Sequence, residues 1–465
     1  MNSKQELIAQ IDSLYHPKSV AIIGLPRGLK TGKLFLLALL DQKFPGEIYA
    51  VHPSATEIDG IKAYKRVSDI PGPVDLAIVL VPHQHALSVV KDCADKGVKG
   101  AILFTAGYKE TGTEEGIALE SELVRVARSS GMRLIGPNGM GLYSPKSGLS
   151  FFPQLSRESG GVGLISHSGS LSNMLGRMGS DLGFGFSKAV SLGNECDLST
   201  ADFLIYLGND PETKLIAVYL EGIRDGRYFI NALKEASLKK PVIIWKMGLT
   251  PEGSAASASH TGGLATSKDM WRGVVQQTGV IQVTGFEQWA DAIMCFSMLP
   301  VNIGNRLAII SGPGGLAVSA TEACGREGLS MAKMASETRS ALAEFVPPTG
   351  TSLKNPIDVG MSASLEIDIY IQAAKIVAAD PGVDTIVMIG VGMDEITNQQ
   401  YTEAIIQMKN DFNKPFVIVK IPGFDAKLVK DILDAGIPVF DSAERALHTY
   451  ASAYRYYDWR RNISR

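Results

Sequence analysis

Short runs of apolar, often β-branched residues alternate along this chain with longer segments in which apolar residues recur at helical spacing. Most of these runs are apolar throughout, which is typical of parallel strands buried on both faces. Near the start, the expected strands are residues 19–23, 47–51, 76–81, 100–104 and 133–135. Helical patterns at 34–40, 84–96 and 115–130 lie between them. This βα alternation predicts a Rossmann-like domain over residues 1–145.

Two further series of the same kind follow, after a stretch at 144–161 that is rich in Ser, Gly and Pro. The second series has expected strands at 162–165, 187–192, 215–220 and 242–246, and the third at 307–310, 385–389, 415–420 and 438–440. We interpret residues 298–306 as the linker between them. The sequence therefore predicts an α/β protein of three consecutive Rossmann-like or flavodoxin-like domains with mainly parallel sheets, over residues 1–145, 146–298 and 299–465.

Composition narrows the class of protein. The chain has 465 residues, of which 45% are apolar and 20% charged, as in globular proteins with filled cores. Its 45 basic residues are balanced by 48 acidic ones without a polybasic block, which excludes a dedicated nucleic-acid binder. Four cysteines suit a reducing compartment, the charged start does not resemble a signal peptide, and no apolar run is long enough to cross a membrane. We therefore expect a cytoplasmic protein that binds no membrane.

The 48 glycines cluster just after apolar runs, and the first cluster follows the first expected strand. Residues 24–33 form a Gly-rich turn with Arg27, Lys30 and Lys33, which suits a polyphosphate at a helix N-terminus. The glycine spacing matches neither a dinucleotide fingerprint nor a Walker A motif. His52 and Pro53 stand where NAD-binding folds place an acidic residue, which disfavours an NAD-dependent dehydrogenase. A glycine turn that only packs is the alternative.

Two more strand ends carry small and hydroxyl residues before a helical pattern. The candidate phosphate-binding residues are Ser166, Ser168, Gly169 and Ser170 at the first end, and Gly312, Gly314 and Gly315 at the second. Backbone N–H groups and hydroxyls at a helix N-terminus form an anion pocket, and two such ends facing one point would hold a phosphoryl group. The first end lacks the Gly-x-Ser-x-Gly of a hydrolase elbow. An ordinary helix cap is the alternative.

A histidine and a carboxylate complete the candidate chemistry. His260 lies in residues 253–267, which carry no formal charge and are nearly all Gly, Ala, Ser or Thr, so we expect a mobile loop. Its neutral imidazole can act as a nucleophile toward phosphorus or an acyl centre. Glu221 follows the strand expected at 215–220, at the edge where α/β sheets place their sites, and can orient that ring. The alternatives are an incidental surface histidine and a Glu221–Arg224 surface pair.

We expect no bound metal, because His83 and His85 lack Cys or acidic companions at ligand spacing.

The order of these motifs is similar to that of a known family. The motifs that carry the similarity are Ala106-Gly107-Tyr108-Lys109-Glu110, Gly136-Pro137-Asn138, Ser166-His167-Ser168-Gly169-Ser170-Leu171, Gly193-Asn194, Asp210-Pro211-Glu212-Thr213, Tyr219-Leu220-Glu221-Gly222-Ile223, Ser259-His260-Thr261-Gly262 and Asn355-Pro356-Ile357-Asp358. Over nearly its whole length the chain resembles the α subunits of NDP-forming acyl-CoA synthetases (acetate–CoA ligase, ADP-forming), within the succinyl-CoA synthetase superfamily.

This resemblance implies a first domain that binds coenzyme A, followed by two succinyl-CoA-ligase-like domains. It implies that His260 is phosphorylated, that Glu221 orients it, and that the two helix ends cradle the phosphate. The residues it places at coenzyme A are Gly24, Leu25, Arg27, Lys33, His52, Pro53, Val81, Pro82 and Asn138.

The implied reaction has three steps. Phosphate attacks an acyl-CoA to give an acyl phosphate and CoA, His260 takes the phosphoryl group and releases the carboxylic acid, and the phosphorylated loop donates to ADP. The reverse direction makes the thioester. Phosphoryl transfer of this kind depends mainly on positioning and charge stabilisation.

The sequence departs from the family at three places near the expected CoA site. Ser54 stands where the family has a lysine, and Gly139 where it has a cysteine. The first turn lacks the usual Ser-Arg-Asn-Pro. The phosphoryl relay is therefore better supported than the CoA contacts.

Many relatives also carry an ATP-grasp domain of about two hundred residues, for which 465 residues leave no room beside three α/β domains. We expect a separate ATP-grasp β subunit that binds ATP or ADP with Mg²⁺, in an α2β2 assembly. The alternative function is a non-catalytic CoA- or acyl-CoA-binding regulatory protein on the same fold.

Overall fold

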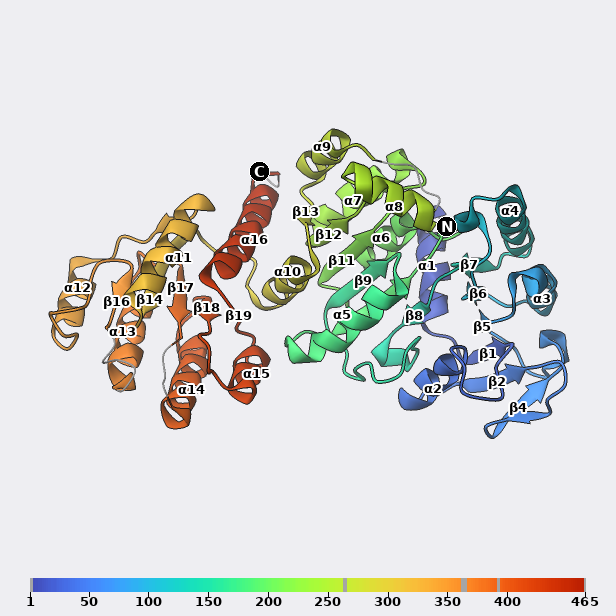
Figure 1. Ribbon diagram of the computed structural model, residues 1–465, viewed down its shortest axis with the longest axis horizontal. Helices are drawn as coiled ribbons and strands as arrows, with labels where there is room; N and C mark the ends of the chain where they lie inside the picture. The colour runs from blue at the N-terminus through green and yellow to red at the C-terminus, as the bar shows by residue number, and fades with distance from the viewer. Residues whose placement is uncertain (1–2, 262–265, 361–365, 391–393, 464–465) are drawn as a thin grey trace. The chain divides into compact units, whose positions relative to one another are not determined.

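The computed structural model describes residues 3–261, 266–360, 366–390 and 394–463, with the side chains of residues 258–261 outside the described part. The chain divides into two compact units (Figure 1). Unit 1 comprises Met1–Ser180 and Phe184–Thr284, and unit 2 comprises Asp181–Gly183 and Gly285–Arg465. Each unit is described by itself.

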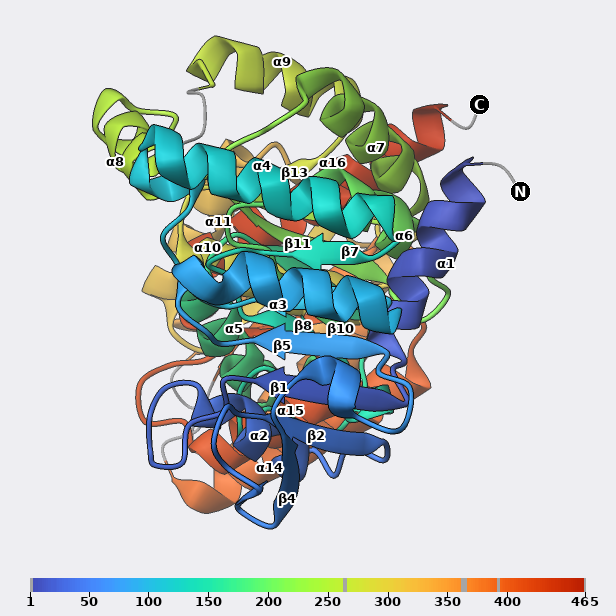
Figure 2. The ribbon, with the colours of Figure 1, turned by 90° about the vertical axis from the view of Figure 1, so that its right-hand side faces the viewer.

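Unit 1 contains two sheets, of which the first is built from the N-terminal βα series. Its strands are, in spatial order, β3 (Glu57–Ile58), β4 (Ile61–Tyr64), β2 (Glu47–Val51), β1 (Ser19–Ile23), β5 (Leu76–Val79), β6 (Gly100–Leu103) and β7 (Arg133–Ile135). All neighbours pair in parallel except β3 with β4. The connecting helices are α2 (Lys33–Asp41), η1 (Val67–Asp69), α3 (His83–Lys96), η2 (Lys109–Thr111) and α4 (Glu114–Ser129). Figure 2 shows α3 and α4 side by side on one face of this sheet, next to β5 and β7.

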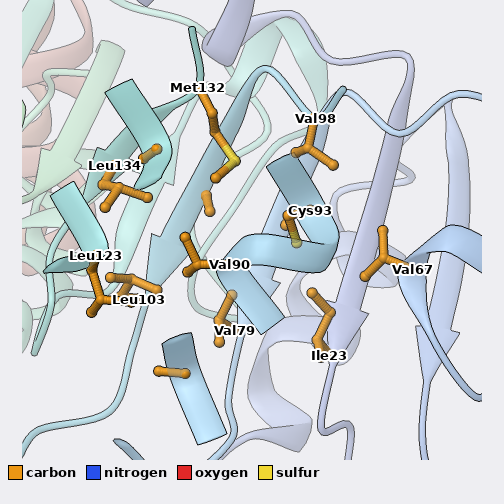
Figure 3. Close-up of a cluster of buried hydrophobic side chains, with 14 of the residues drawn as sticks. Ile23, Val67, Val79, Val90, Cys93, Val98, Leu103, Leu123, Met132 and Leu134 are labelled. Carbon is orange, nitrogen blue, oxygen red and sulfur yellow. The ribbon is translucent and has the colours of Figure 1, made fainter. Parts of the chain in front are cut away.

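The core of this sheet explains why its strands are apolar throughout. Ile23 and Val79 from adjacent strands pack against Val90 and Cys93 of α3 and Leu123 of α4, all at most 2% exposed (Figure 3). Burying such side chains stabilises the fold by roughly 1.5–3 kcal/mol each. The core fixes the strand ends, from which the functional loops start.

The second sheet of unit 1 follows the same plan. Its strands are, in spatial order, β13 (Ile281–Val283), β12 (Val242–Lys246), β11 (Leu215–Leu220), β9 (Val162–Ser166), β10 (Phe186–Ser191) and β8 (Gly141–Tyr143). Only β8 is antiparallel to its neighbour. The helices are α1 (Ser3–Tyr15), η3 (Pro145–Ser147), α5 (Gly169–Asp181), α6 (Thr200–Asn209), α7 (Gly226–Lys239), α8 (Pro251–Thr261) and α9 (Lys268–Thr278).

A buried carboxylate ties the two sheets of unit 1 together. Asp197, in the β10–α6 loop, accepts hydrogen bonds from Arg128 Nε at 2.8 Å, Arg133 Nε at 2.8 Å and the backbone N–H of Leu134 at 2.9 Å. Burial raises the pKa of this carboxyl, but Arg133, Leu134 and Arg128 together outweigh burial and hold the pKa below its ordinary value of 3.8. Asp197 is therefore ionised in the folded protein at neutral pH.

Replacement of this residue in Asp197→Asn is expected to lower the free energy of unfolding by about 3 kcal/mol at pH 7, because Arg133 loses its buried partner. A lowered folded-state pKa contributes stability above the unfolded pKa, and that contribution is lost as pH falls through the folded value. The difference between wild type and variant should therefore shrink below pH 3.8. Urea unfolding, monitored by circular dichroism at several pH values from 7 to 3, measures the free energy of unfolding of both proteins. Asp269→Asn, which removes an exposed Asp269–Arg272 pair, is the control and should leave stability unchanged. An equal loss at every pH would contradict this account.

Unit 2 contains the third sheet, with every strand pairing in parallel. Its strands are, in spatial order, β15 (Ser330–Met331), β14 (Arg306–Ser311), β17 (Thr385–Ile389), β18 (Phe416–Val419) and β19 (Val439–Phe440), and β16 (Ile357–Asp358) also pairs with β14. The helices are α10 (Phe286–Met298), α11 (Gly314–Arg326), α12 (Ser336–Ala343), α13 (Ile367–Ala379), α14 (Glu395–Asp411), α15 (Ala426–Asp434) and α16 (Ala443–Ile463).

The predicted fold class, three successive α/β series with mainly parallel sheets, is confirmed. Two elements lie across the predicted domain boundaries, which stay a prediction. Strand β8 falls within residues 1–145 but pairs with β10 of the second sheet, and α10 falls within 146–298 but packs on α16 of unit 2. None of the helices in the described residues is long and apolar enough to cross a membrane.

One local expectation was wrong. Residues 253–261 belong to helix α8, where the sequence analysis expected a loop. Alanine is the best helix former, and Ala255 and Ala256 lie in this segment. Thr250 Oγ1 also accepts the N–H of Gly253 at 3.0 Å and supports the first turn.

Candidate active site

The second sheet reverses its strand order beside β9, and this reversal marks the site. Strand β10 lies on one side of β9 and β11 on the other. In open parallel sheets ligands bind at such a point, outside the carboxyl ends of the strands. Here the chain leaves β9 after Ser166 and leaves β11 after Leu220, so the Ser166–Ser170 turn and Glu221 start from neighbouring strand ends.

The turn after β9 forms the N-terminal end of α5. Ser168 Oγ accepts the N–H of Leu171 at 3.3 Å and lies 3.1 Å from Ser170 Oγ, while the Ser166 hydroxyl donates to the Ser168 carbonyl at 2.8 Å. Among the described residues, none accepts a hydrogen bond from the backbone N–H of Gly169 or Ser170. Such N–H groups, with the positive end of the helix dipole, suit an anion.

Glu221 is buried at the end of β11, with 7% of its surface exposed. Tyr219 lies two residues earlier on the same face of the strand, so its side chain lies near the Glu221 carboxylate. Burial and this carboxylate raise the pKa of Tyr219 well above its ordinary value. The Tyr219 ring packs edge-on against Trp245 of β12, with ring centroids 5.1 Å apart. Arg224 instead donates to the Cys196 carbonyl at 2.7 Å.

Two buried side chains that the sequence analysis did not select contact the main chain of Glu221. His167 Nδ1 accepts the Glu221 N–H at 3.2 Å, and Lys246 Nζ donates to the Glu221 carbonyl at 2.9 Å. His167 Nε2 lies 2.9 Å from Glu195 Oε1 and 3.2 Å from Thr200 Oγ1. His167 lies within the Ser166–Ser170 motif, but only the serines and the glycine of that motif were predicted to bind phosphate. Lys246 ends a predicted strand and carried no motif signal.

His260 lies on α8, which follows β12 at the same carboxyl edge, and its side chain is outside the described residues. The preceding turn of α8 can be placed. A Cβ at Gly248 would lie 3.3 Å from Ser257 Oγ and 3.8 Å from the Glu221 carbonyl oxygen. Gly248 has a φ of +75°, which favours glycine. Ser257, less than one helical turn before residue 260, therefore lies close to the main chain of Glu221.

The predicted second helix end, in unit 2, already has an anion beside it. Gly312 precedes α11, and Gly314 and Gly315 form its first turn. A Cβ at Gly314 would lie 2.5 Å from Asp358 Oδ2, so this carboxylate lies against the helix N-terminus. A resident carboxylate opposes a second anion at that point. The N-termini of α5 and α11 therefore differ, and the binding of one phosphoryl group by both of them stays a prediction.

The first sheet also reverses its order, between β1 and β5, and a cavity of about 300 Å³ opens there. Four predicted CoA residues line it, namely Gly24, His52, Pro53 and Val81. Gly24 has a φ of +82°, and a Cβ there would lie 3.0 Å from Val81 Cγ1, so glycine is needed for this close approach. Lys65 and Arg66 also line the cavity and were missed, because they follow β4, a strand that was not predicted.

The other predicted CoA residues lie around this edge in different roles. Arg27 is exposed and donates to Ser54 Oγ at 3.0 Å. Leu25 is fully buried, and Pro82 precedes the first residue of α3. The Asn138 N–H donates to the Thr105 carbonyl at 3.1 Å.

Lys33, which was predicted to contact CoA, has a carboxylate partner within the chain. It is buried and forms an ion pair with Asp59 of the β3–β4 turn, and it does not line the cavity.

Two of the motifs meet between the sheets of unit 1. Glu110 Oε1 accepts the N–H of Gly107 at 2.5 Å, and Asn194 Nδ2 donates to Glu110 Oε2 at 2.5 Å and to Glu120 Oε2 at 3.0 Å. Helix α8 packs against η2, which contains Glu110. The helix that carries His260 thus contacts the domain of the first sheet at this junction.

Among the side chains that the structure describes, no group of three or more His, Cys, Asp or Glu residues could hold a metal ion.

Comparison with known proteins decides the family. The α subunit of acetate–CoA ligase [ADP-forming] II from Pyrococcus furiosus is 36% identical over 97% of this chain and 98% of its own length. The chain belongs to the family of ADP-forming acetate–CoA ligase α subunits. Within this family, the 4-hydroxybutyrate–CoA ligase [ADP-forming] of Nitrosopumilus maritimus is 32% identical over 95% of the chain, which covers 64% of that protein.

The solved structures and domain families agree with this membership. The dinucleotide-forming acetyl-coenzyme A synthetase 1 of Candidatus Korarchaeum cryptofilum, solved in complex with phosphate and ADP, superposes with a TM-score of 0.88 and 33% identity over 98% of each chain. Residues 18–145 match a family described as a CoA binding domain. Residues 159–296 match one described as a succinyl-CoA ligase like flavodoxin domain, which contains the Ser166–Ser170 turn, Glu221 and His260.

Proposed function

We propose that this chain is the α subunit of an ADP-forming acyl-CoA synthetase, an acid–thiol ligase that interconverts acyl-CoA, ADP and phosphate with a carboxylic acid, CoA and ATP. The observation that carries the proposal is the arrangement around Glu221. A buried carboxylate lies at the strand-order reversal, one strand from an α5 N-terminus whose Gly169 and Ser170 N–H groups have no acceptor among the described residues. The helix that carries His260 passes beside its main chain.

The reaction proceeds through an acyl phosphate and phospho-His260. A phosphate oxygen attacks the thioester carbon, the C–S bond breaks, and the CoA thiolate leaves and takes up a proton. A ring nitrogen of His260 then attacks phosphorus, the P–O bond to the acyl group breaks, and the carboxylate leaves. Finally an ADP oxygen attacks phosphorus, the P–N bond breaks, and ATP forms.

The residues of the site have separate roles in this scheme. Glu221 accepts a hydrogen bond from the second ring nitrogen of His260 and stabilises the positive charge that the ring gains on phosphorylation. Ser168, Gly169 and Ser170 at the α5 N-terminus bind the phosphoryl oxygens. The same role for Gly312, Gly314 and Gly315 is the weaker part of the proposal, because Asp358 lies beside that helix end.

The nucleotide and Mg²⁺ bind to a separate ATP-grasp β subunit, and two copies of each chain form an α2β2 assembly. Support comes from the 4-hydroxybutyrate–CoA ligase [ADP-forming] of Nitrosopumilus maritimus, of which this chain covers only 64%, and from the relative named as an α subunit, of which it covers 98%. We place the complex in the cytoplasm, because all four cysteines are free and buried, as suits a reducing compartment.

A test of the proposed function measures release of the CoA thiol. The chain, alone and with an ATP-grasp partner, is mixed with a panel of acyl-CoA thioesters, with and without phosphate. The expected result is release that requires phosphate, limited to one CoA per site without partner and ADP, and continuous with both. Binding of CoA or acyl-CoA with no phosphate-dependent release would favour the regulatory alternative.

The CoA cavity gives a separate prediction. Lys65 lines the cavity beside His52 and Pro53, and we expect its ammonium to contact a CoA phosphate. Lys65→Ala should raise the KM for CoA about tenfold, the equivalent of about 1.4 kcal/mol, with kcat unchanged. Lys62→Ala is the matched control, because Lys62 lies on β4, the strand that Lys65 follows, with Nζ 5.2 Å from the Tyr64 ring centroid and outside the cavity lining. Steady-state kinetics with CoA as the varied substrate measure the KM of each variant. An equal rise in the KM of both variants would contradict CoA binding in this cavity.

A further inference from the structure

The main chain of Glu221 is held from both sides by buried side chains of the two neighbouring strands. His167 follows β9 and is 6% exposed, and Lys246 ends β12 and is 5% exposed. His167 accepts a hydrogen bond from the Glu221 N–H, and Lys246 donates one to the Glu221 carbonyl. Burying either polar group costs free energy unless it is hydrogen-bonded, and here each one is satisfied by the main chain of the same residue.

The partners of His167 define its tautomer. Nδ1 accepts the Glu221 N–H, so this nitrogen carries no proton. In the neutral ring the proton is therefore on Nε2, which donates to Glu195 Oε1 at 2.9 Å. Glu195 Oε1 also accepts the backbone N–H of Thr200 at 2.7 Å and the Thr200 hydroxyl, so it acts as an acceptor in each of these contacts. Glu195 is thus an acceptor that fixes the ring with Nδ1 facing Glu221.

Lys246 completes the arrangement from the opposite side. Its Nζ donates to the carbonyl of Met247 at 2.5 Å as well as to that of Glu221. Burial lowers the pKa of Lys246 to about 8, although the nearby charge of Glu221 acts in the other direction. At neutral pH the buried ammonium lies close to the carboxylate that the phosphoryl relay uses.

We propose that His167 and Lys246 are positioning residues that fix the main chain of Glu221, and through it the place of the Glu221 carboxylate beside Tyr219. For the role of Glu221 this inference rests on the proposed function. The contact with His167 also ties Glu221 to Glu195 and Thr200 in the β10–α6 region. A displacement of about 1 Å at such a group can cost roughly 10²-fold in rate.

The first test does not depend on activity. ¹⁵N NMR of the histidine-labelled full chain reads the ring tautomer, and the His167→Gln variant assigns the signal. The expected result is a proton on Nε2 and none on Nδ1. Hydrogen exchange at the Glu221 amide should be faster in His167→Leu than in wild type, with the amides of β9 and β11 unchanged. A proton on Nδ1, or an unchanged Glu221 amide, would overturn the proposal.

The second test measures phosphorylation kinetics in the complete enzyme with its partner subunit. His167→Leu and Lys246→Met should each lower kcat roughly 10- to 100-fold with the KM for CoA unchanged. His167→Gln should recover most of the rate, because its amide oxygen can accept from Glu221 and its amide N–H can donate to Glu195. Circular dichroism and thermal unfolding confirm that each variant folds.

Matched controls exist for both positions. Lys240 lies just before β12, at the amino edge of the same sheet, and donates to the carbonyls of Leu207 and Asp210. As for Lys246, burial lowers its pKa to about 8. Lys240→Met therefore removes the same chemistry away from Glu221 and should leave kcat unchanged. For the histidine, the control is His448→Leu, which removes a ring paired with Glu327 in unit 2 and should also leave kcat unchanged.

A double-mutant cycle separates positioning from general stability. In a Glu221→Gln background, His167→Leu should lower kcat by less than threefold, because the group it positions is already impaired. A full and additive loss in that background would contradict positioning through Glu221. If wild type forms no phosphoenzyme, the proposed function fails, while the ring tautomer and the Glu221 amide still decide whether this contact exists.

Discussion

The variant His260→Ala is expected to form ATP from acyl-CoA, ADP and phosphate at less than about one-thousandth of the wild-type rate, when assayed with its partner subunit. The reason is that the imidazole forms the covalent bond to phosphorus in the proposed reaction, and the alanine side chain has no nucleophilic atom. CoA binding should be unchanged, because the cavity that we propose for CoA is lined by residues of the first domain. A coupled assay for ATP measures the rate, and calorimetry measures CoA binding.

A matched control is the exposed His16, which contacts only Asp12 among the described residues. His16→Ala should retain the wild-type rate. The phosphate-dependent release of CoA in a single turnover should survive in His260→Ala, because acyl phosphate forms before the histidine reacts. A His260→Ala enzyme that still makes ATP at more than one-tenth of the wild-type rate would contradict a phosphohistidine relay.

The second large effect is expected for Glu221→Gln, which keeps the shape of the side chain and removes its charge. The carboxamide of the variant can still contact Tyr219. Because it has no charge, it stabilises the positively charged ring of phosphorylated His260 much less than the Glu221 carboxylate does. We expect kcat to fall roughly 10²- to 10³-fold, with the KM for CoA within about twofold of wild type. The measurement is the rate of phosphorylation of His260 in rapid-quench experiments.

Glu252→Gln serves as the control, because Glu252 is an exposed carboxylate in the first turn of α8. It carries the same charge change on the helix that holds His260, and it should leave the rate unchanged. Equal losses in the two variants would indicate a general electrostatic effect on α8. A wild-type rate in Glu221→Gln would remove Glu221 from the mechanism.

The main sheets could be predicted because their strands carry a strong local signal. Runs such as residues 215–220 and 242–246 are apolar on both faces, so their pattern alone specifies buried parallel strands. Strands β4 and β8 have only four and three residues, and such short runs gave no comparable signal. Helix α8 was missed because its Gly, Ala, Ser and Thr content resembles a loop, while its alanines favour a helix.

The site could be predicted only where a residue type at a strand end carries the chemistry. Glu221 and the Ser166–Ser170 turn follow predicted strands, and the strand order places them side by side. His167 and Lys246 contact Glu221 through distances that depend on the pairing of three strands, which no local pattern specifies. The Lys33–Asp59 ion pair likewise joins distant segments, and no local pattern indicated it.

The most direct measurement of the central claim is labelling of the chain from ³²P-phosphate. The chain and its partner are mixed with a panel of acyl-CoA thioesters and labelled phosphate, and the protein is then separated and treated with acid or base. We predict a label that is lost in acid, stable in base, present at up to one per chain, and absent from His260→Ala. No label with any thioester of the panel, or an undiminished label in His260→Ala, would contradict the account.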